Sequence, residues 1–334
     1  MNKNAFLITV TLASSLFWAG CNKSGKLDQA STFTTPTGPV ELKPKWPAGE
    51  HVVQSFDMKL GMEMSVPNQP NPIKQDIALG QKYGLTVLKA DAAGGPEVEM
   101  EFLGLRMKID QGGRTVMDYD SEGKSSNGGK DRNAAAIQKS FQNIIGAKIQ
   151  YFLDASNQVE RIEGVDALMS RLTTGGRADA TDSIKSLFNE GSLKQMIGSR
   201  YLPSKPVQPG DTWPVQMDIA MGDLGTMVMD YTCSFERWEQ HGKRNCARLE
   251  FQGTVKSKPD PDSKPKRMTV SVQDGNSSGV SWFDPELGMV IETTLNQDMK
   301  MNMTVPVNVR GKQTTQTMTS LMHQTITVKL ESVK

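Results

Sequence analysis

The feature that most constrains this chain is a period-two alternation of apolar and polar residues along several long segments. In 51–66 the even positions from Phe56 to Val66 are apolar, whereas Asp57 and Glu63 occupy odd positions. Successive side chains of a strand point to opposite faces of a sheet, so the pattern predicts a strand with one buried face and one solvated face. The same alternation recurs in 77–87, 213–221, 227–235, 268–272, 289–305 and 318–330.

The segment 97–109 carries this alternation with one change of phase. Its apolar residues move from even positions, such as Met100, to odd positions, such as Leu105, and the change falls near Phe102 and Leu103. One extra residue in a strand reverses the faces of the side chains beyond it. We therefore expect a β-bulge or a bend at this point.

Helical spacing of apolar residues occurs between the two groups of strands, in 134–145, 165–172 and 178–202. Such stripes need an apolar surface to cover, and a one-sided antiparallel sheet offers one. The predicted fold class is α+β and predominantly β, with long antiparallel strands in one or two curved sheets or half-barrels and a helical segment packed on the apolar face. The predicted divisions are a signal peptide, a tether, a first β group, the helical segment and a second β group, at 1–20, 21–45, 46–133, 134–202 and 203–334.

The first twenty residues have the composition of a secretory signal peptide. Lys3 precedes an apolar run at 5–17, which is shorter than the roughly twenty residues that a membrane-spanning helix needs. Trp18-Ala19-Gly20-Cys21 then resembles the lipobox of bacterial lipoproteins, in which the cysteine receives a diacylglycerol. The resemblance implies cleavage before Cys21 and a lipid anchor on it. The alternative is an ordinary signal peptide followed by an incidental cysteine.

The mature chain has no net charge to attract nucleic acid. Removal of 1–20 takes Lys3 from the 38 basic residues and leaves 37, which equals the 37 acidic residues. We therefore expect no nucleic-acid partner, and the lipid on Cys21 is the one membrane attachment that we predict. The segment that follows the predicted lipidated cysteine has the composition of a linker. Residues 22–45 are rich in Ser, Thr, Lys, Gly and Pro and have no hydrophobic period, which predicts a flexible tether. By the sorting pattern of lipoproteins in double-membrane bacteria, Asn22 implies the periplasmic face of the outer membrane.

Cys233 and Cys246 are the only other cysteines, and a pair in an exported chain invites a disulfide. The apolar residues around both are odd-numbered, which places Cys233 on the buried face and Cys246 on the opposite face. Opposed residues of an antiparallel pair point the same way, so a direct cross-strand bridge needs a bulge. The sequence leaves both a disulfide and two free thiols open.

Methionine is unusually frequent, with twenty residues, and several are spaced two apart. Residues two apart in a strand share a face, so each group presents adjacent thioethers. Three hypotheses follow: a filler of irregular core, a deformable groove for an acyl chain or another hydrophobic ligand, and a copper(I) site. The candidate ligand-lining residues are Met62, Met64, Met227, Met229, Met299, Met301 and Met303, and the last three are the best copper cluster.

No catalytic or metal-binding constellation is evident in the sequence. The histidines, His51, His241 and His323, lie far apart and outside any zinc spacing. The S-x-x-K match at 263–266 lies in a charged Pro-rich loop, where a nucleophile would be solvated. The residues from Asp118 onward begin like a calcium-binding loop, but the twelfth position is Gly129, where such a loop has a glutamate that binds the ion. The sequence therefore predicts no enzyme, no cofactor and no metal.

Short turn-and-strand motifs are the remaining signal. Pro209-Gly210-Asp211-Thr212-Trp213 suits a tight turn in which Asp211 bonds the turn backbone and Trp213 starts a strand. Together with Leu202-Pro203, 279–284 and Leu287-Gly288, and with 118–121 and 159–164, it resembles an uncharacterised family of exported bacterial lipoproteins. The family has no established activity, so the resemblance implies an architecture and an address but no chemistry.

The function predicted from the sequence is a non-enzymatic envelope lipoprotein with a structural or assembly role. The alternatives are a carrier of a hydrophobic ligand such as a lipid, and copper(I) binding by the methionine clusters. The predicted partners are the membrane, through Cys21, and either a hydrophobic small molecule or an envelope protein. An open methionine-lined cavity would favour the carrier, and a packed methionine face would favour the structural role.

Overall fold

The computed structural model of the 334-residue chain describes residues 27, 29–67, 69–90, 94–123, 132–173, 193–194, 197, 201–220, 226–258, 269–309 and 312–334. Strands dominate this part of the chain, and the two helices are short. In chain order the elements are β1 His51–Ser65, β2 Ile73–Lys89, β3 Glu97–Gln111, β4 Arg114–Asp120, α1 Arg132–Ile144, β5 Lys148–Leu153, β6 Val159–Glu163, α2 Val165–Thr173, β7 Thr212–Ala220, β8 Thr226–His241, β9 Arg244–Lys258, β10 Thr269–Asp284, β11 Met289–Val309 and β12 Lys312–Val333.

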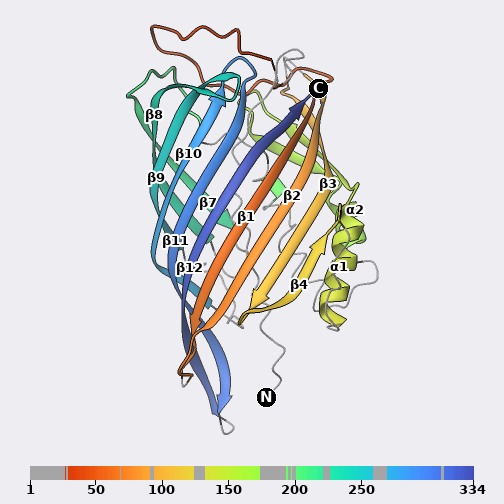
Figure 1. The fold of residues 1–334 in the computed structure, drawn as a ribbon, viewed down its shortest axis with the longest axis vertical. Helices are drawn as coiled ribbons and strands as arrows, with labels where there is room; N and C mark the ends of the chain where they lie inside the picture. The colour runs from red at the N-terminus through yellow and green to blue at the C-terminus, as the bar shows by residue number, and fades with distance from the viewer. Residues whose placement is uncertain are drawn as a thin grey trace.

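All twelve strands belong to one antiparallel sheet. The strand order is β6-β5-β3-β2-β1-β12-β11-β10-β9-β8-β7, and β4 pairs with β3 off this path. The strands β1 and β12 pair from Val52 with Val333 to Ser65 with Thr319. This pairing joins the two predicted strand groups, so the predominantly β fold is confirmed in its one-sheet form (Figure 1).

The predicted face alternation and its single change of phase are both confirmed. In β1 the even residues are buried and the odd residues are half-buried or exposed. Between β2 and β3, Lys82 pairs with Gly104 and Tyr83 with Phe102, which leaves Leu103 as the extra residue of a bulge. The bulge keeps apolar side chains on the buried face of β3 despite the shift in the sequence.

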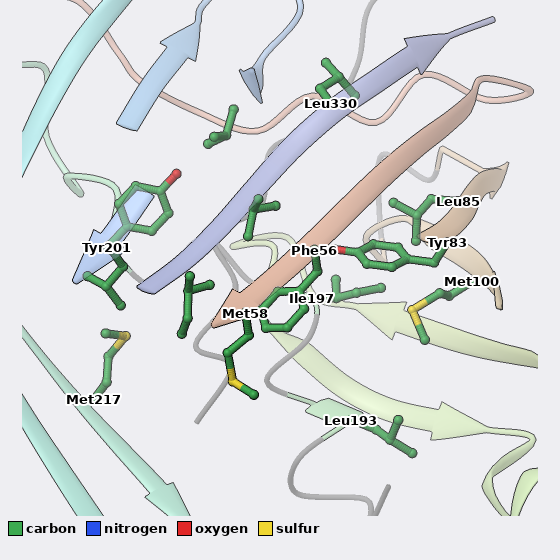
Figure 2. Close-up of a cluster of buried hydrophobic side chains, with 14 of the residues drawn as sticks. Phe56, Met58, Tyr83, Leu85, Met100, Leu193, Ile197, Tyr201, Met217 and Leu330 are labelled. Carbon is green, nitrogen blue, oxygen red and sulfur yellow. The ribbon is translucent and has the colours of Figure 1, made fainter. Parts of the chain in front are cut away.

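The sheet curves until β7 lies across the core from β1 (Figure 1). Met217 of β7 and Met58 of β1 belong to the same buried cluster (Figure 2). Glycines allow neighbouring strands to approach closely where the sheet bends: a Cβ on Gly253 would lie 2.2 Å from the carbonyl oxygen of Asp230. Any larger residue there would displace the backbone of β8.

The middle of the concave face is filled by residues that follow the second helix. Leu193, Ile197 and Tyr201 are each at most 2% exposed. Figure 2 shows Ile197 beside Phe56 and Tyr83 on the inner side of the sheet. The hydroxyl of Tyr151 donates a hydrogen bond to the carbonyl oxygen of Leu193 at 3.2 Å, which fixes this segment against β5.

The two helices cover one edge of the sheet only. The strongest contacts of α1 and α2 are with each other, with β4 and with β5, and both helices lie beside β3 and β4 in Figure 1. The helical segment predicted for 134–202 is interrupted, because β5 and β6 lie between α1 and α2. The local signal for β5 was the alternation of Ile149, Tyr151 and Leu153, all buried in the structure. Most of the third predicted helix, 178–202, lies outside the described residues.

Residues 29–45, which we call the strap, lie against the upper end of the sheet in Figure 1. Leu42 is 1% exposed, and Val40 forms an isolated bridge with Val207. Asn245 donates a side-chain hydrogen bond to the hydroxyl of Thr35 at 3.0 Å. The part of the predicted tether from residue 29 onward is therefore held to the sheet at several points.

Candidate ligand-binding face

The seven candidate methionines all lie in strands of the curved sheet, but the structure brings only some of them together. Met62 on β1 pairs with Met322 on β12, and Met322 pairs with Met299 on β11. In the next row Ser320 lies between Met64 and Met301, and Met303 pairs with Met318. The methionines of β1 and β11 thus become neighbours through β12. The pair on β8, Met227 and Met229, lies on the other side of β9 and β10.

The sequence analysis did not single out Met318 and Met322, which complete these rows. Their signal was present, since both occupy the apolar phase of the last alternating segment. The alternation could not show that these methionines are neighbours, because a sequence pattern does not specify the order of strands in a sheet.

The methionine face is almost entirely buried. Met62, Met64, Met299 and Met303 are 4%, 2%, 4% and 3% exposed, and Met301 is half-buried. On β8, Met227 is 3% exposed and Met229 is fully buried. Flexible thioethers fill irregular space well, so this burial supports the core-filling interpretation.

The face is divided between two hydrophobic clusters. Met299 belongs to the main core, against which Met301 and Met322 pack. Met64, Met303 and Met318 form a separate small cluster, which we call the far cluster, together with half-buried Val66, Ile73, Val270 and Val305. The methionine rows therefore connect the main core to the end of the sheet at which the β11–β12 hairpin extends (Figure 1).

Polar side chains cross the concave face beside these methionines. Tyr231 on β8 shares a hydrogen bond of 2.8 Å with Ser277 on β10, and its hydroxyl also contacts the sulfur of Met229 at 3.1 Å. Gln297 on β11 is fully buried and donates through Nε2 to the Tyr231 hydroxyl at 3.5 Å. Burial raises the pKa of the Tyr231 hydroxyl, although the hydrogen bonds with Ser277 and Gln297 act to lower it. At neutral pH the hydroxyl is therefore a proton donor.

Two buried polar atoms on this face have no hydrogen-bond partner among the described residues. They are Oε1 of Gln297 and the hydroxyl oxygen of Ser320, and both residues are fully buried. An unsatisfied buried acceptor or hydroxyl costs about 1–3 kcal/mol. A bound group that donated a hydrogen bond to either oxygen would recover part of this cost.

The described residues contain no group of three or more His, Cys, Asp and Glu that could hold a metal. His323 follows Met322, but its imidazole lies at the exposed side of the sheet, with Nδ1 2.7 Å from a carboxylate oxygen of Asp298. The methionine rows on β1, β11 and β12 thus offer thioethers without an adjacent imidazole or thiolate. Thioethers alone select a soft ion such as copper(I) but bind it weakly without such partners.

The structure contains Cys233 and Cys246 as free, buried thiols. Cys233 pairs with Phe251 across β8 and β9, whereas Cys246 pairs with Glu239. Burial raises the pKa of the Cys233 thiol to about 12 and also raises the pKa of Cys246. Neither sulfur is a thiolate at neutral pH, so neither can act as a nucleophile in this state.

A polar groove of about 290 Å³ lies over β1 to β4. Arg106, which pairs with Asp57, lies across Gly80, and a Cβ at Gly80 would overlap its side chain. Lys82 and Glu122 form an ion pair of 3.3 Å at the same groove. Sequence reasoning missed this groove, although the glycines at 80 and 104 were visible within alternating segments.

The two predicted turns have structural roles in the fold. The carboxylate of Asp211 accepts a hydrogen bond from the amide of Gln208 at 2.8 Å, and the Trp213 indole donates to the carbonyl oxygen of Tyr201 at 2.7 Å. Gly288 has a φ of 68°, a conformation that favours glycine, and closes the hairpin between β10 and β11.

The sequence comparisons support one assignment. Residues 94–332 match a single family model, described as a family of unknown function, DUF6263. The chain belongs to this family. The family's match covers the sheet from β3 to β12, including most of the methionine rows. No curated protein matches the chain.

Two solved structures have distant similarity to this chain. Lipovitellin, from a structure on lipid–protein interactions, matches with a TM-score of 0.44 and 10% identity. The match covers 86% of this chain and 26% of the lipovitellin chain. This chain therefore spans about a quarter of the lipovitellin chain. A protein described as a lipoprotein, from Parabacteroides distasonis, has a TM-score of 0.29 and 11% identity, with coverage of 89% and 100%. Similarities at these TM-scores carry no argument about function.

The predicted lipidation site, Cys21, lies outside the described residues. Among the helices that the structure describes, none is both long and apolar enough to cross a membrane.

Proposed function

We propose that this protein is a non-enzymatic lipoprotein of the cell envelope with a structural or assembly role. The lipid on Cys21 anchors it at the periplasmic face of the outer membrane. The observation that carries the structural role is the burial of the methionine face, because a filled face is core and not an open ligand cavity.

The state of the nucleophilic side chains supports the absence of enzymatic activity. Both described thiols are buried and protonated at neutral pH. Arg244 and Asp284 form a buried ion pair, and Arg244 also pairs with half-buried Glu286, to which the strap bonds. In this arrangement the charges of Arg244 and Asp284 are engaged with each other and shielded from solvent.

A hydrophobic-ligand carrier is the second candidate, and one observation favours it. Gln297 Oε1 and the Ser320 hydroxyl oxygen are buried without a described partner, beside methionines that can repack. A ligand with an apolar chain and one hydroxyl or amide donor suits this combination.

Native mass spectrometry of residues 22–334, purified without detergent, distinguishes the two roles. A bare monomer mass is expected for the structural role. A lipid-sized increment that persists in Thr325→Ala but is lost in Ser320→Ala would overturn that role in favour of the carrier. Thr325 is a matched control, since it lies on the opposite face of β12. An increment of one copper mass would favour the metal hypothesis.

Metabolic labelling with palmitate tests the anchor separately. The full-length chain should incorporate label, and Cys21→Ser should not. Equal labelling of the two proteins, or label in neither, would contradict lipidation at Cys21.

A further inference from the structure

We propose that the strap end of the sheet faces the lipid bilayer, so that the β11–β12 hairpin points away from it. The strap end comprises the strap, the turn between β8 and β9, and the turn between β10 and β11. The inference rests on the proposed lipid anchor at Cys21 and adds an orientation and a membrane-contacting surface.

Two hydroxyl groups of the strap bond to the same glutamate at this end. Ser31 donates through its hydroxyl to Glu286 at 2.9 Å, and Thr32 donates through its hydroxyl to the other carboxylate oxygen at 2.5 Å. Burial acts to raise the pKa of Glu286, but the bonds from Thr32 and Ser31 and the charge of Arg244 outweigh it and lower the pKa. The carboxylate is therefore ionised at neutral pH and holds the strap with charge-assisted hydrogen bonds.

Arg244 makes this attachment rigid. Its side chain is 4% exposed and pairs with the fully buried carboxylate of Asp284 and, at 2.7 Å, with Glu286. It also donates to the carbonyl oxygen of Gln29 at 3.5 Å. The turns between β8 and β9 and between β10 and β11 are thus joined to the first residues of the strap.

The length of chain from this point to Cys21 is short. Gln29 is eight residues from Cys21. At most 3.6 Å per residue, those eight residues span about 29 Å when fully extended. A lipid inserted through Cys21 therefore keeps the bilayer surface within about 29 Å of Gln29, the residue whose carbonyl oxygen Arg244 contacts.

The opposite end of the sheet is much farther away. The strand β11 runs from Met289, beside the strap end, to Val309 at the hairpin. At about 3.3 Å per residue, its 21 residues extend for roughly 65–70 Å. The anchor can thus hold the strap end near the bilayer while the β11–β12 hairpin stays far from the bilayer surface.

The tryptophans indicate which surface contacts the lipid. The mature chain has four, Trp46, Trp213, Trp238 and Trp282, and all are half-buried and packed against the main core. Two of them lie at the strap end: the Phe33 ring of the strap packs at a tilt against Trp238 with ring centroids 5.2 Å apart, and the Trp282 ring stacks on His241 at 4.3 Å. Half-buried tryptophan is the residue that proteins place at the membrane–water interface.

The partner that fits this surface is a lipid headgroup region of low net charge. The predicted mature chain, residues 21–334, carries no net charge. Binding therefore depends on the anchor and the aromatic side chains, and anionic lipid is not required.

Fluorescence quenching on vesicles tests this orientation. The full lipidated chain carries one introduced cysteine, Lys243→Cys at the strap end or Thr315→Cys in the hairpin, labelled with an environment-sensitive dye. Lys243 and Thr315 are exposed, and the native thiols are buried, so the dye reports one position. The protein is incorporated into phosphatidylcholine vesicles that contain a headgroup nitroxide, and floated vesicles are measured.

Quenching should be several-fold stronger at position 243 than at position 315. Equal quenching would show that the molecule lies flat, and stronger quenching at 315 would show the reverse orientation; either result overturns the inference while leaving the anchor intact. A chain that does not float with the vesicles overturns the proposed anchor itself.

A strap variant identifies the cause of the difference. Ser31→Ala together with Thr32→Ala should reduce the difference between positions 243 and 315, whereas Thr34→Ala, an exposed neighbour in the strap, should preserve it. An unchanged difference in the double variant would overturn the role of the strap contacts in setting the orientation.

Discussion

The two ends of the sheet are stabilised by different interactions. At the strap end, Arg244 is buried with Asp284 and pairs with half-buried Glu286, and a segment more than 200 residues away in the chain bonds to Arg244 and Glu286. At the opposite end, Met64, Met303 and Met318 pack against one another in the far cluster, and Met64 pairs across the strands with buried Ser320. Charged groups require one geometry, whereas thioethers accept several, so the strap end is specific and the far cluster is adaptable.

The comparison is tested most strongly by removal of the buried cation. Arg244→Ala leaves the fully buried Asp284 carboxylate without its partner, and we expect a loss of about 3–5 kcal/mol in the free energy of unfolding. Urea denaturation measures it. The control is Arg248→Ala, whose side chain is 16% exposed and whose partners are about a third exposed, with an expected loss of about 1 kcal/mol or less. Equal losses of unfolding free energy in Arg244→Ala and Arg248→Ala would show that the strap end is no more specific than the neighbouring part of the sheet.

Thiol reactivity tests whether the strap end and the middle of β8 are closed. Because burial raises the pKa of Cys233 from 9.0 to about 12, its thiolate fraction at pH 8 falls by about a thousandfold. Cys246, beneath the strap end, should also be unreactive because burial raises its pKa. Alkylation followed by mass spectrometry should modify neither thiol in native protein and both in urea. A mass two daltons lower, from a disulfide, would contradict the free thiols.

Methionine substitutions test the adaptability of the far cluster. Met303→Ala should cost about 2–3 kcal/mol, since it leaves a cavity in a buried position. Met303→Leu nearly conserves volume and should cost less than about 1.5 kcal/mol. The triple replacement of Met299, Met301 and Met303 by Leu should still fold, as circular dichroism and urea denaturation can establish. A triple variant that unfolds would show that this end is as specific as the strap end.

The smallest expected effect lies outside both ends, in the groove over β1 to β4. Gly80→Ala places a Cβ against the flexible Arg106 side chain, which must move away from Asp57. The expected cost is about 1 kcal/mol or less, because the ion pair is exposed. Gly61→Ala is the matched control, with its nearest atom at 3.5 Å. A loss above that of Met303→Ala would mean that the groove contributes more to stability than the far cluster.

Strand positions were predictable where the alternation is long. The pattern in 51–66 predicted β1, and the change of phase near Leu103 predicted the bulge opposite Lys82. Short elements were less predictable: β5 and β6 lie within the predicted helical segment 134–202, between two stretches with helical spacing, and the six residues of alternation in β5 were too few to separate them from it. Local pattern measures the periodicity of burial, and a short strand has too few periods to be distinguished from a helix turn.

The candidate site was predictable as a list of residues and not as an arrangement. The sequence identified Met62 and Met299 as members of apolar strand faces, but their proximity depends on Met322, which lies between them on β12. Likewise, the composition of residues 29–45 predicted a tether, while their bonds to Glu286 depend on a partner that lies more than 240 residues later.

The sequence by itself determined the long one-sided strands, the bulge in β3 and the apolar faces on which the methionines lie. Only the tertiary structure decided the strand order, the burial of Gln297 and Ser320, and the attachment of the strap to the turns between β8 and β9 and between β10 and β11. The physical reason is the range of each interaction. Alternation is a property of neighbouring residues, whereas strand pairing and buried charge pairs are set by the competition among all distant segments for the same partners.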